Sequence, residues 1–536
     1  MKHLFSTLAL VTCMAATAQG QVKVVNASGT GDFTTINDAL AFFDTDTDPA
    51  ENVIQISDDA AYNEIISISE PVTIEGTGAE RARLILKNNP DGISAKGGIV
   101  INLPSTLSTG TVTLKNIVIL PEVVHIPKVS TTPAQRVTAA IENVNNNLCL
   151  ILDNVLISAN DGTDQPLMDN GYDNDILKLV PSNAAYDPDA TSFALHGLVL
   201  GRSGSAHTEL DGVELILKDS IITHIRGDYQ PAAVQPDRTF PRGIWMYNPY
   251  GTNPANYENP AINSIRRITR VLGDSAVSFT RFSMSIAGDL EMSNPGGRIH
   301  MRGAGNVAID LDGPAMNFRN IEDVYFTGNS AVGVTDHGWG SVRWNMKNCV
   351  SFETLNNVIS VNNQTNQHAS GLINIEDSTL VGGRWVSNSN TTGQGPTHHT
   401  FRLSPGTETD VNISNTILGG KRNHTTATVN VIYLGGTNDV TISDSAIITD
   451  GPFSFYENGA TLVEGSSVLT TTNIINADPG LLGWDMPVGI PFDPSVEDFM
   501  DVTNPLYATA GANGEPLKGG ARYAGPSTRV DNWSVY

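Results

Sequence analysis

Three basic residues in the C-terminal third of the chain, Arg384, Lys421 and Arg422, form the first candidate for a chemical site. Arg384 and Arg422 each follow a recurring Asn or Asp by seven residues, and Lys421 comes one place earlier. An arginine can hold a carboxylate through two parallel hydrogen bonds, and a Lys or Arg of lowered pKa can remove the proton alpha to it. These residue types predict contact with an acidic sugar, with β-elimination as the chemistry if the site is catalytic.

The same offset of seven residues carries charge elsewhere in the chain. The residues found there are Asp161, Arg226, Asp336, Leu355, Arg384, Arg422 and Gly451. If the repeats stack, equal offsets become a column, so these charges would lie along one line. The alternative is that the offset only marks where strands end and solvent begins, because strand ends are commonly charged.

A second candidate is the segment from about 226 to 270, which interrupts the repeats. It holds six arginines against three acidic residues, a charge of 6 − 3 = +3, and it is rich in aromatic residues. Aromatic rings stack on sugars, and loops of this length are usually functional or disordered. The alternative is that the aromatic residues pack the loop under arginine stems. The predicted substrate-binding residues are Arg226, Arg242, Trp245, Tyr247 and Tyr250.

Metal ligands are sparse in the sequence. Asp336-His337 and His398-His399 are the only histidine clusters that invite a metal interpretation, and neither has the ligand spacing of a zinc site. The surplus of carboxylates favours calcium, with Asp336 as a candidate ligand, although no motif of three aspartates is present. No other cofactor is predicted.

A repeated pattern must position these residues. Eight units centre on an Asn or Asp that follows apolar residues two and four places earlier and precedes further apolar residues. The centres are Asn116, Asn154, Asp219, Asn329, Asn348, Asp377, Asn415 and Asp444. Alternation on both sides of a fixed polar residue indicates strand, sharp bend, strand. Irregular gaps between the centres suit a solenoid whose loops leave from one corner. We predict an all-β fold, a right-handed parallel β-helix of roughly a dozen coils.

The ends of the chain differ from the repeats. Residues 1–18 have a basic start, a short apolar run and small residues at the exit, which predicts a secretory signal peptide. Thr35 and Asp38 are placed to cap a short helix at about residues 34–44, which could close the open end of the solenoid. The β-helix domain is predicted over residues 19–477, with residues 478–536 as a C-terminal cap and tail.

Composition limits the possible partners. The chain has 31 basic and 56 acidic residues, a net charge of −25, which argues against nucleic acid or anionic lipid as a partner of the whole surface. No stretch after the signal peptide is long and apolar enough to span a membrane. Only Cys149 and Cys349 remain in the mature chain, so disulfides cannot form its scaffold. The oligomeric state stays open.

Two N-terminal stretches resemble a known superfamily. "GTGDFTTINDAL" and "AYNEIISISEPVTIEGTG" are similar to the opening of pectin methylesterases and of the wider pectate-lyase-like β-helix superfamily. The matching residues are Gly31, Asp32, Phe33, Thr35, Ile36, Tyr62, Glu64, Ile74, Gly76 and Gly78. In that superfamily these residues are structural. The esterase motifs do not follow, because there is no Gln-Asp dipeptide and "GGRW" lacks the expected proline.

The resemblance implies a β-helix and places the charges after the bends near a substrate groove. The closing stretch "DPGLLG" also looks like the last coil of secreted bacterial β-helix proteins. We therefore expect a secreted, extracellular or periplasmic protein that acts on or binds an anionic polysaccharide, with a polysaccharide lyase as the enzyme class to test. The alternative is a non-catalytic surface, adhesion or carbohydrate-binding β-helix protein.

Overall fold

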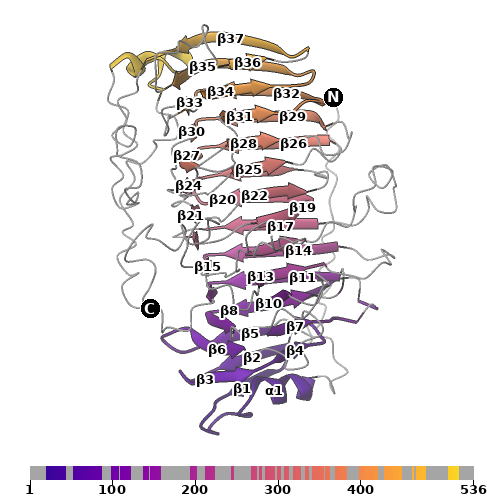
Figure 1. Cartoon of the computed structure of the whole chain (residues 1–536). Coiled ribbons are helices and arrows are strands. Elements are labelled where there is room, and N and C mark those ends of the chain that lie inside the picture. Colours follow the sequence, from indigo (N-terminus) through magenta and orange to yellow (C-terminus); the bar gives the residue numbers. More distant parts are fainter. Residues whose placement is uncertain are drawn as a thin grey trace, which may run out of the picture.

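A computed structural model of the chain gives an elongated stack of strands with the N-terminal strands at one end (Figure 1). The structure describes residues 20–43, 52–86, 98–104, 106–107, 109–121, 137–143, 145, 147–158, 194–201, 212–223, 243–246, 267–273, 277–280, 284–295, 299–302, 307–312, 318–327, 332–336, 341–354, 357–362, 369–382, 397–420, 428–449, 461–463, 466–477 and 505–517. The predicted signal peptide lies outside these residues.

The described strands pair in parallel, and almost every strand pairs with the third strand after it in the chain. Three ladders result. Ladder 1 contains β1 (Val22–Val25), β2 (Asn52–Ile56), β5 (Val72–Gly76), β8 (Gly110–Lys115), β11 (Asn147–Asp153), β14 (Gly212–Lys218), β17 (Arg267–Leu272), β20 (Asp289–Ser293), β23 (Arg319–Glu322), β26 (Ser341–Lys347), β29 (Ala369–Glu376), β32 (Thr407–Ser414), the first part of β35 (Asp439–Thr449) and β37 (Val468–Ile475).

Ladder 2 contains β3 (Ala61–Glu64), β6 (Ala82–Leu86), β9 (Ile117–Pro121), β12 (Leu156–Ser158), β15 (Ile221–Thr223), β18 (Val277–Thr280), β21 (Ile299–Arg302), β24 (Val324–Thr327), β27 (Val350–Thr354), β30 (Thr379–Gly382), β33 (Ile417–Gly420) and the last part of β35. Ladder 3 contains β4 (Ile66–Ile68), β7 (Ile99–Ile101), β10 (Val137–Asn143), β13 (Ala194–Leu200), β16 (Ile244–Met246), β19 (Met284–Ala287), β22 (Val307–Asp312), β25 (Val332–Asp336), β28 (Asn357–Val361), β31 (Thr397–Leu403), β34 (Thr428–Leu434) and β36 (Thr461–Val463).

We call one passage through ladders 1, 2 and 3 a coil. Ladder 3 is a sheet of 12 strands, so the described chain makes about a dozen coils, as the sequence predicts. Long parallel sheets wound in this way are consistent with a β-helix or solenoid. The prediction of an all-β fold is confirmed at this level.

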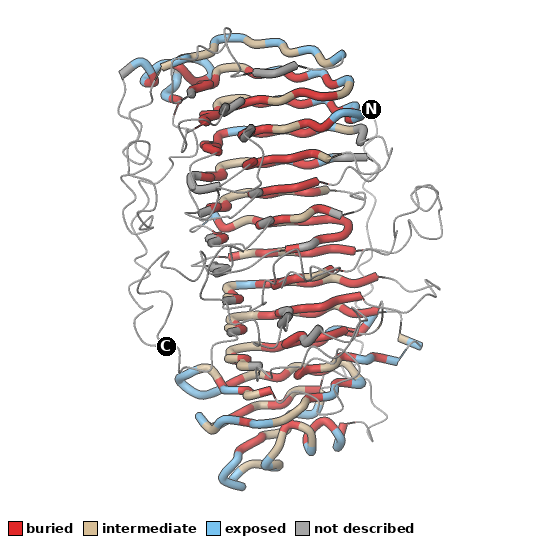
Figure 2. The backbone as a smooth tube through the Cα atoms, viewed as in Figure 1, coloured by how far each residue is buried: buried red, intermediate tan, exposed pale blue. Residues whose placement is uncertain are grey.

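The core consists of apolar columns that run along the stack (Figure 2). Successive strands of ladder 1 place one inward aliphatic side chain directly above the last. From Ile54 through Ile74 and Leu114 to Ile413 and Ile442, these side chains are at most 1% exposed. Since strands alternate inward and outward side chains, the period-two pattern of the sequence is the direct cause of this column.

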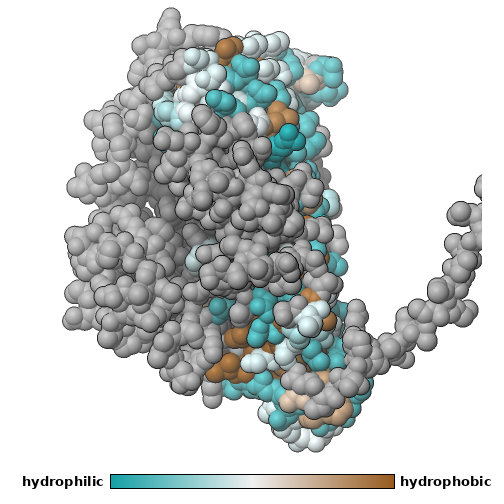
Figure 3. All heavy atoms as spheres, turned by 90° about the vertical axis from the view of Figure 1, so that its right-hand side faces the viewer, coloured by the Kyte–Doolittle hydropathy of each residue, from teal (hydrophilic) through white to brown (hydrophobic). Residues whose placement is uncertain are grey.

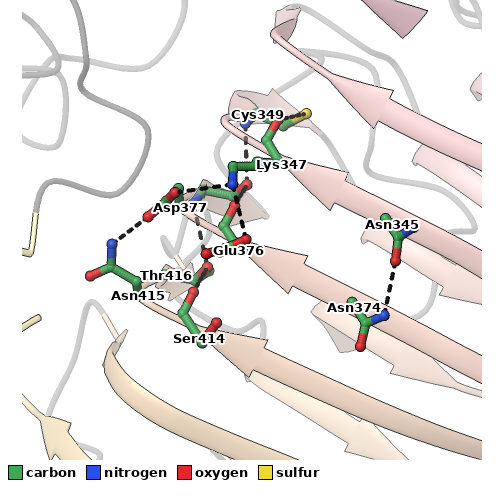
Figure 4. Close-up of polar contacts among 10 residues, drawn as sticks. Asn345, Lys347, Cys349, Asn374, Glu376, Asp377, Ser414, Asn415 and Thr416 are labelled. Atoms are coloured by element: carbon green, nitrogen blue, oxygen red, sulfur yellow. Dashed lines mark hydrogen bonds and ion pairs between the residues drawn. The ribbon is translucent and has the colours of Figure 1, made fainter. Parts of the chain in front are cut away.

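The predicted bends separate ladder 1 from ladder 2. Seven of the eight predicted centres have a left-handed backbone with φ between 46° and 56°, which Asn and Asp tolerate better than most residues. Their side chains form a ladder that we call the bend ladder. Asn154 donates to Asn116 Oδ1 (2.8 Å), Asn348 to Asp323 Oδ1 (2.7 Å), and Asn415 to Asp377 (Figure 4). Stacked amides therefore tie consecutive coils together.

One predicted centre is wrong. In its coil the bend is at Asp323 (φ 59°), and Asn329 lies outside the described residues. The signal is hidden because Arg319 occupies an inward position four places before Asp323, where other coils have an apolar residue. Asn473 (φ 53°) is a further bend that the sequence pattern missed, because Thr471 stands where an apolar residue was expected.

In several coils, the residue after the bend forms hydrogen bonds with backbone groups at the bend. In four consecutive coils it is Cys349, Ser378, Thr416 and Ser445. Ser378 Oγ accepts from the Cys349 N–H (3.1 Å) and donates to the Glu376 carbonyl (2.8 Å), and Thr416 and Ser445 repeat this arrangement (Figure 4). Buried backbone groups at the bend thus find partners inside the protein.

Helix α1 (Ile36–Phe43) lies beside the first strands at the N-terminal end (Figure 1). Ile36, Ala39, Leu40 and Phe43 are buried and join the hydrophobic core. Thr35 Oγ1 accepts the Asp38 N–H (3.1 Å), as the sequence predicts. Glu64 adds a contact that the sequence does not show, because its two oxygens accept the N–H groups of Ile36 (2.9 Å) and Asn37 (3.0 Å). A carboxylate is favourable at a helix N-terminus.

Two strands lie inside the segment that the sequence predicts as a loop insertion at about 226–270. They are β16 and the start of β17, and both pair with neighbouring coils. β16 has three residues, too few for an alternation to be recognised in the sequence. At the C-terminal end, residues 505–517 form two short 3-10 helices, η5 (Pro505–Thr509) and η6 (Ala512–Gly514), and Tyr507 donates to the Ala477 carbonyl (2.6 Å).

None of the helices in the described part of the chain has the length and hydrophobicity that crossing a membrane requires.

Candidate functional site

Most of the predicted site residues lie outside the described part of the chain. These are the predicted catalytic residues Arg384, Lys421 and Arg422 and the predicted binding residues Arg226, Arg242, Tyr247 and Tyr250. Their roles remain predictions. Trp245 and Asp336 are described, and the structure places them in different surroundings.

Asp336 lies in the interior at the end of β25. It pairs with Arg319 across 2.9 Å, and both side chains are 1% exposed. Arg319 also donates through Nε to the Gly288 carbonyl (3.0 Å). The carboxylate therefore compensates a buried guanidinium, as a buried charge requires. Within the described ranges no group of three or more His, Cys, Asp or Glu residues could hold a metal ion.

Asp336 also does not belong to the predicted column of charges. Its offset of seven was counted from Asn329, but the bend of that coil is at Asp323. The other members of that column lie outside the described residues. Asp336 is instead the last residue of β25, a strand of ladder 3.

Trp245 is the middle residue of β16, between the buried Ile244 and Met246, and it is half-buried. Because neighbours in a strand point to opposite faces, Trp245 faces outward. The register continues from strand to strand and forms one outward column on ladder 3. The column contains Val100, Glu142, Val199, Trp245, Asp310, Thr335, Ser360, Arg402 and Tyr433. Four of these residues are buried, at most 7% exposed: Glu142, Val199, Thr335 and Ser360.

Within this column, Arg402 and Tyr433 have the side chains best suited to contact a ligand. These half-buried residues are direct neighbours on β31 and β34. The Arg402 guanidinium carbon lies 5.9 Å from the centre of the Tyr433 ring, at the range of a cation–π contact. The ring of His399, which lies on the same strand as Arg402, has its centre 4.9 Å from that of Tyr433. The phenol ring therefore lies near both a cation and an imidazole of the neighbouring strand.

Asn362 orients this cluster. Its Oδ1 accepts hydrogen bonds from Arg402 (3.1 Å), Ser360 (3.1 Å) and Ser404 (2.9 Å). A guanidinium has five N–H donors in a planar fork, so a bond from Nη1 to Asn362 leaves donors for a ligand. The arrangement presents a preoriented cation beside an aromatic ring, which suits a sugar that carries a carboxylate or sulfate.

The acidic members of the column are set apart from Arg402. Asp310 is three strands away, roughly 14 Å at the usual strand spacing, and Glu142 is further along the stack.

Sequence reasoning missed Arg402 and Tyr433 because it aligned the chain on the bends between ladders 1 and 2. A second alignment would have found them. "VISV", "TFRL" and "VIYL" share buried residues at alternate positions, and Ser360, Arg402 and Tyr433 are the outward residues between them. That signal is short, and variable loops separate its copies.

No protein-family model matches this chain, and no curated protein sequence matches it.

Proposed function

We propose that this chain is an exported, right-handed parallel β-helix protein, closed by α1 at its N-terminal end, that binds an anionic polysaccharide at Arg402 and Tyr433 on ladder 3. The observation that carries this proposal is the Arg402–Tyr433 pair, held by Asn362, in the same column as Trp245. The basic and aromatic residues predicted from the sequence supply the same chemistry.

Binding to polygalacturonate, alginate and a sulfated glycan tests this proposal. Arg402→Gln should weaken binding of a polyanion about tenfold or more, the scale of one lost hydrogen bond to a charged group. Arg83→Gln is the matched control, because Arg83 is an exposed arginine on ladder 2. Affinity should fall as salt rises. Unchanged affinity in Arg402→Gln, with the protein folded, would contradict the placement of the site.

β-Elimination is the second candidate function. A cation that neutralises a uronate carboxylate and a base that removes the neighbouring proton are the two groups it needs, and Arg402 lies next to the phenol of Tyr433. Arg384, Lys421 and Arg422 remain candidates for the same roles. Cleavage would create an unsaturated sugar that absorbs ultraviolet light, so uronate polymers with and without calcium provide the assay. Binding without cleavage on every polymer would favour the non-catalytic, adhesion-type alternative.

A further inference from the structure

A second array of polar residues lies on the outward face of ladder 1. The register places four asparagines and two threonines in one column across six consecutive coils. They are Asn320, Asn345, Asn374, Asn412, Thr441 and Thr470. We call this column the outer amide column. It is distinct from the bend ladder, whose bonds are mostly half-buried.

The amides of the column bond to one another in a single direction. Asn345 donates to Asn320 Oδ1 (2.9 Å), Asn374 to Asn345 (2.9 Å), and Asn412 to Asn374 (3.1 Å), and all three bonds are solvent-exposed. Figure 4 shows the bond between Asn374 and Asn345. A primary amide has two donors and an acceptor oxygen with two lone pairs. Each internal link uses one donor and one acceptor, so the array still presents an N–H and a lone pair at intervals of one strand spacing, about 4.8 Å.

The fold does not require asparagine at these positions. In earlier coils the same column is Thr73, Thr113, Ile151 and Ile216, residues that favour strands, and then Arg270 and Glu291, which form an ion pair directly before Asn320. Asparagine is depleted in strands, and an exposed hydrogen bond adds little net stability because water replaces it. Four successive asparagines therefore oppose the local strand preference without a matching gain in folding, a mismatch that is expected at functional surfaces.

The surroundings of the column disfavour a polyanion. Lys347 is paired with Glu376 at 3.2 Å. The neighbouring outward column holds, in successive coils, the exposed residues Arg343, Leu372, Asp410 and Asp439. Beside the outer amide column, acidic residues are at least as numerous as basic residues. Leu372, 39% exposed, adds an apolar patch beside the amides. On the face drawn in Figure 3, the described residues are mostly hydrophilic, with several hydrophobic residues grouped in the lower part.

We propose that the outer amide column binds an uncharged linear polysaccharide that lies along the stack. Its hydroxyl groups would satisfy the outward N–H groups and oxygens of successive coils, and the apolar face of a sugar ring would cover Leu372. The match depends on a ligand that repeats donors and acceptors at nearly the strand spacing, as a polymer of pyranose rings does. This surface acts independently of ladder 3.

Calorimetry with the full-length mature protein tests the proposal. The probes are hexasaccharides and disaccharides of β-1,4-linked glucose, mannose, xylose and N-acetylglucosamine. At least one hexasaccharide should bind more tightly than its disaccharide, with little change between low and high salt because no ionic contact is made. The variant Asn345→Thr/Asn374→Thr should bind about tenfold more weakly, the scale of two neutral hydrogen bonds.

Thr is a better strand residue than Asn, so the double variant should fold, and an unchanged circular dichroism spectrum checks this. Asn63→Thr, at an exposed position on ladder 2, is the matched control and should bind normally. Arg402→Gln should also bind the neutral probe normally, which separates this surface from the proposed site on ladder 3. The proposal is overturned if no neutral hexasaccharide binds, if the double variant binds as well as the parent, or if sedimentation shows that the column joins two copies of the chain.

Discussion

Asp and Asn alternate along the bend ladder over the last six bends, and the substitution Asn348→Asp tests why. The order is Asp323, Asn348, Asp377, Asn415, Asp444, Asn473. Each Asn donates to the Asp of the preceding coil, as in the 2.8 Å bond from Asn473 to Asp444. This order keeps carboxylates two coils apart. Asn348→Asp would place a carboxylate between Asp323 and Asp377.

The expected cost has two parts. The lost hydrogen bond to Asp323, 2.7 Å long in the parent, is worth about 1.5–3 kcal/mol because its acceptor is charged. Repulsion between carboxylates about 4 Å apart at a half-buried site adds roughly 1–4 kcal/mol, for an effective dielectric between that of water and that of a protein surface. The substitution should therefore lower the free energy of unfolding by about 3–7 kcal/mol at neutral pH.

Two companion variants separate the causes. Asn348→Gly keeps the left-handed backbone (φ 52°) and loses only the side-chain bond, whereas Asn348→Ala also incurs strain of about 1–2 kcal/mol. Urea denaturation at pH 7 should rank the variants in stability as Gly, then Ala, then Asp. At acidic pH the new carboxyl becomes protonated and can donate, so Asn348→Asp should regain stability relative to Ala. If Asp is as stable as Ala at pH 7, repulsion does not explain the alternation.

Three further substitutions or treatments test other parts of the structure. Glu64→Gln should lower the stability of the N-terminal end by about 1–2 kcal/mol, because the charge at the α1 N-terminus is lost, whereas the exposed Asp410→Asn should change urea denaturation little. Asp336→Asn should cost about 3–5 kcal/mol in the same assay because it removes a carboxylate that pairs with the buried Arg319, and a loss below about 1 kcal/mol would argue against that pairing. Burial raises the pKa of the Cys149 thiol, and the positive charge of Arg270 offsets part of this shift, so little thiolate forms at neutral pH. Alkylation of Cys149 in the folded protein should therefore be slow at pH 7, and its rate should keep rising well into the alkaline range. Rapid alkylation at pH 7 would contradict this.

The repeat itself was legible in the sequence. Apolar side chains at alternate positions around Asn116, Asn415 and Asp444 reflect a local rule, since a strand has a period of two and a left-handed bend favours Asn or Asp. The same is true of the helix start at Thr35. Such features depend on residues close in the chain, so the all-β class, the coil number and most of the bends followed from sequence alone.

Tertiary structure decided which coil each bend belongs to wherever the local pattern was broken. Arg319 hid the bend at Asp323 because an arginine can be inward only when a distant residue, Asp336, neutralises it. Glu64 was present in the sequence, but its bonds to the first turn of α1 span 28 residues for Ile36.

The candidate site shows most clearly which features depend on the tertiary structure rather than on local sequence. Arg402 and Tyr433 are 31 residues apart in the chain, and Trp245 is far from both, yet one register aligns them on ladder 3. The outer amide column likewise joins residues from separate coils. The sequence determined that side chains on each strand alternate between core and surface. Which surface residues become neighbours depends on loop lengths that set the register between coils, and only the folded stack determines that.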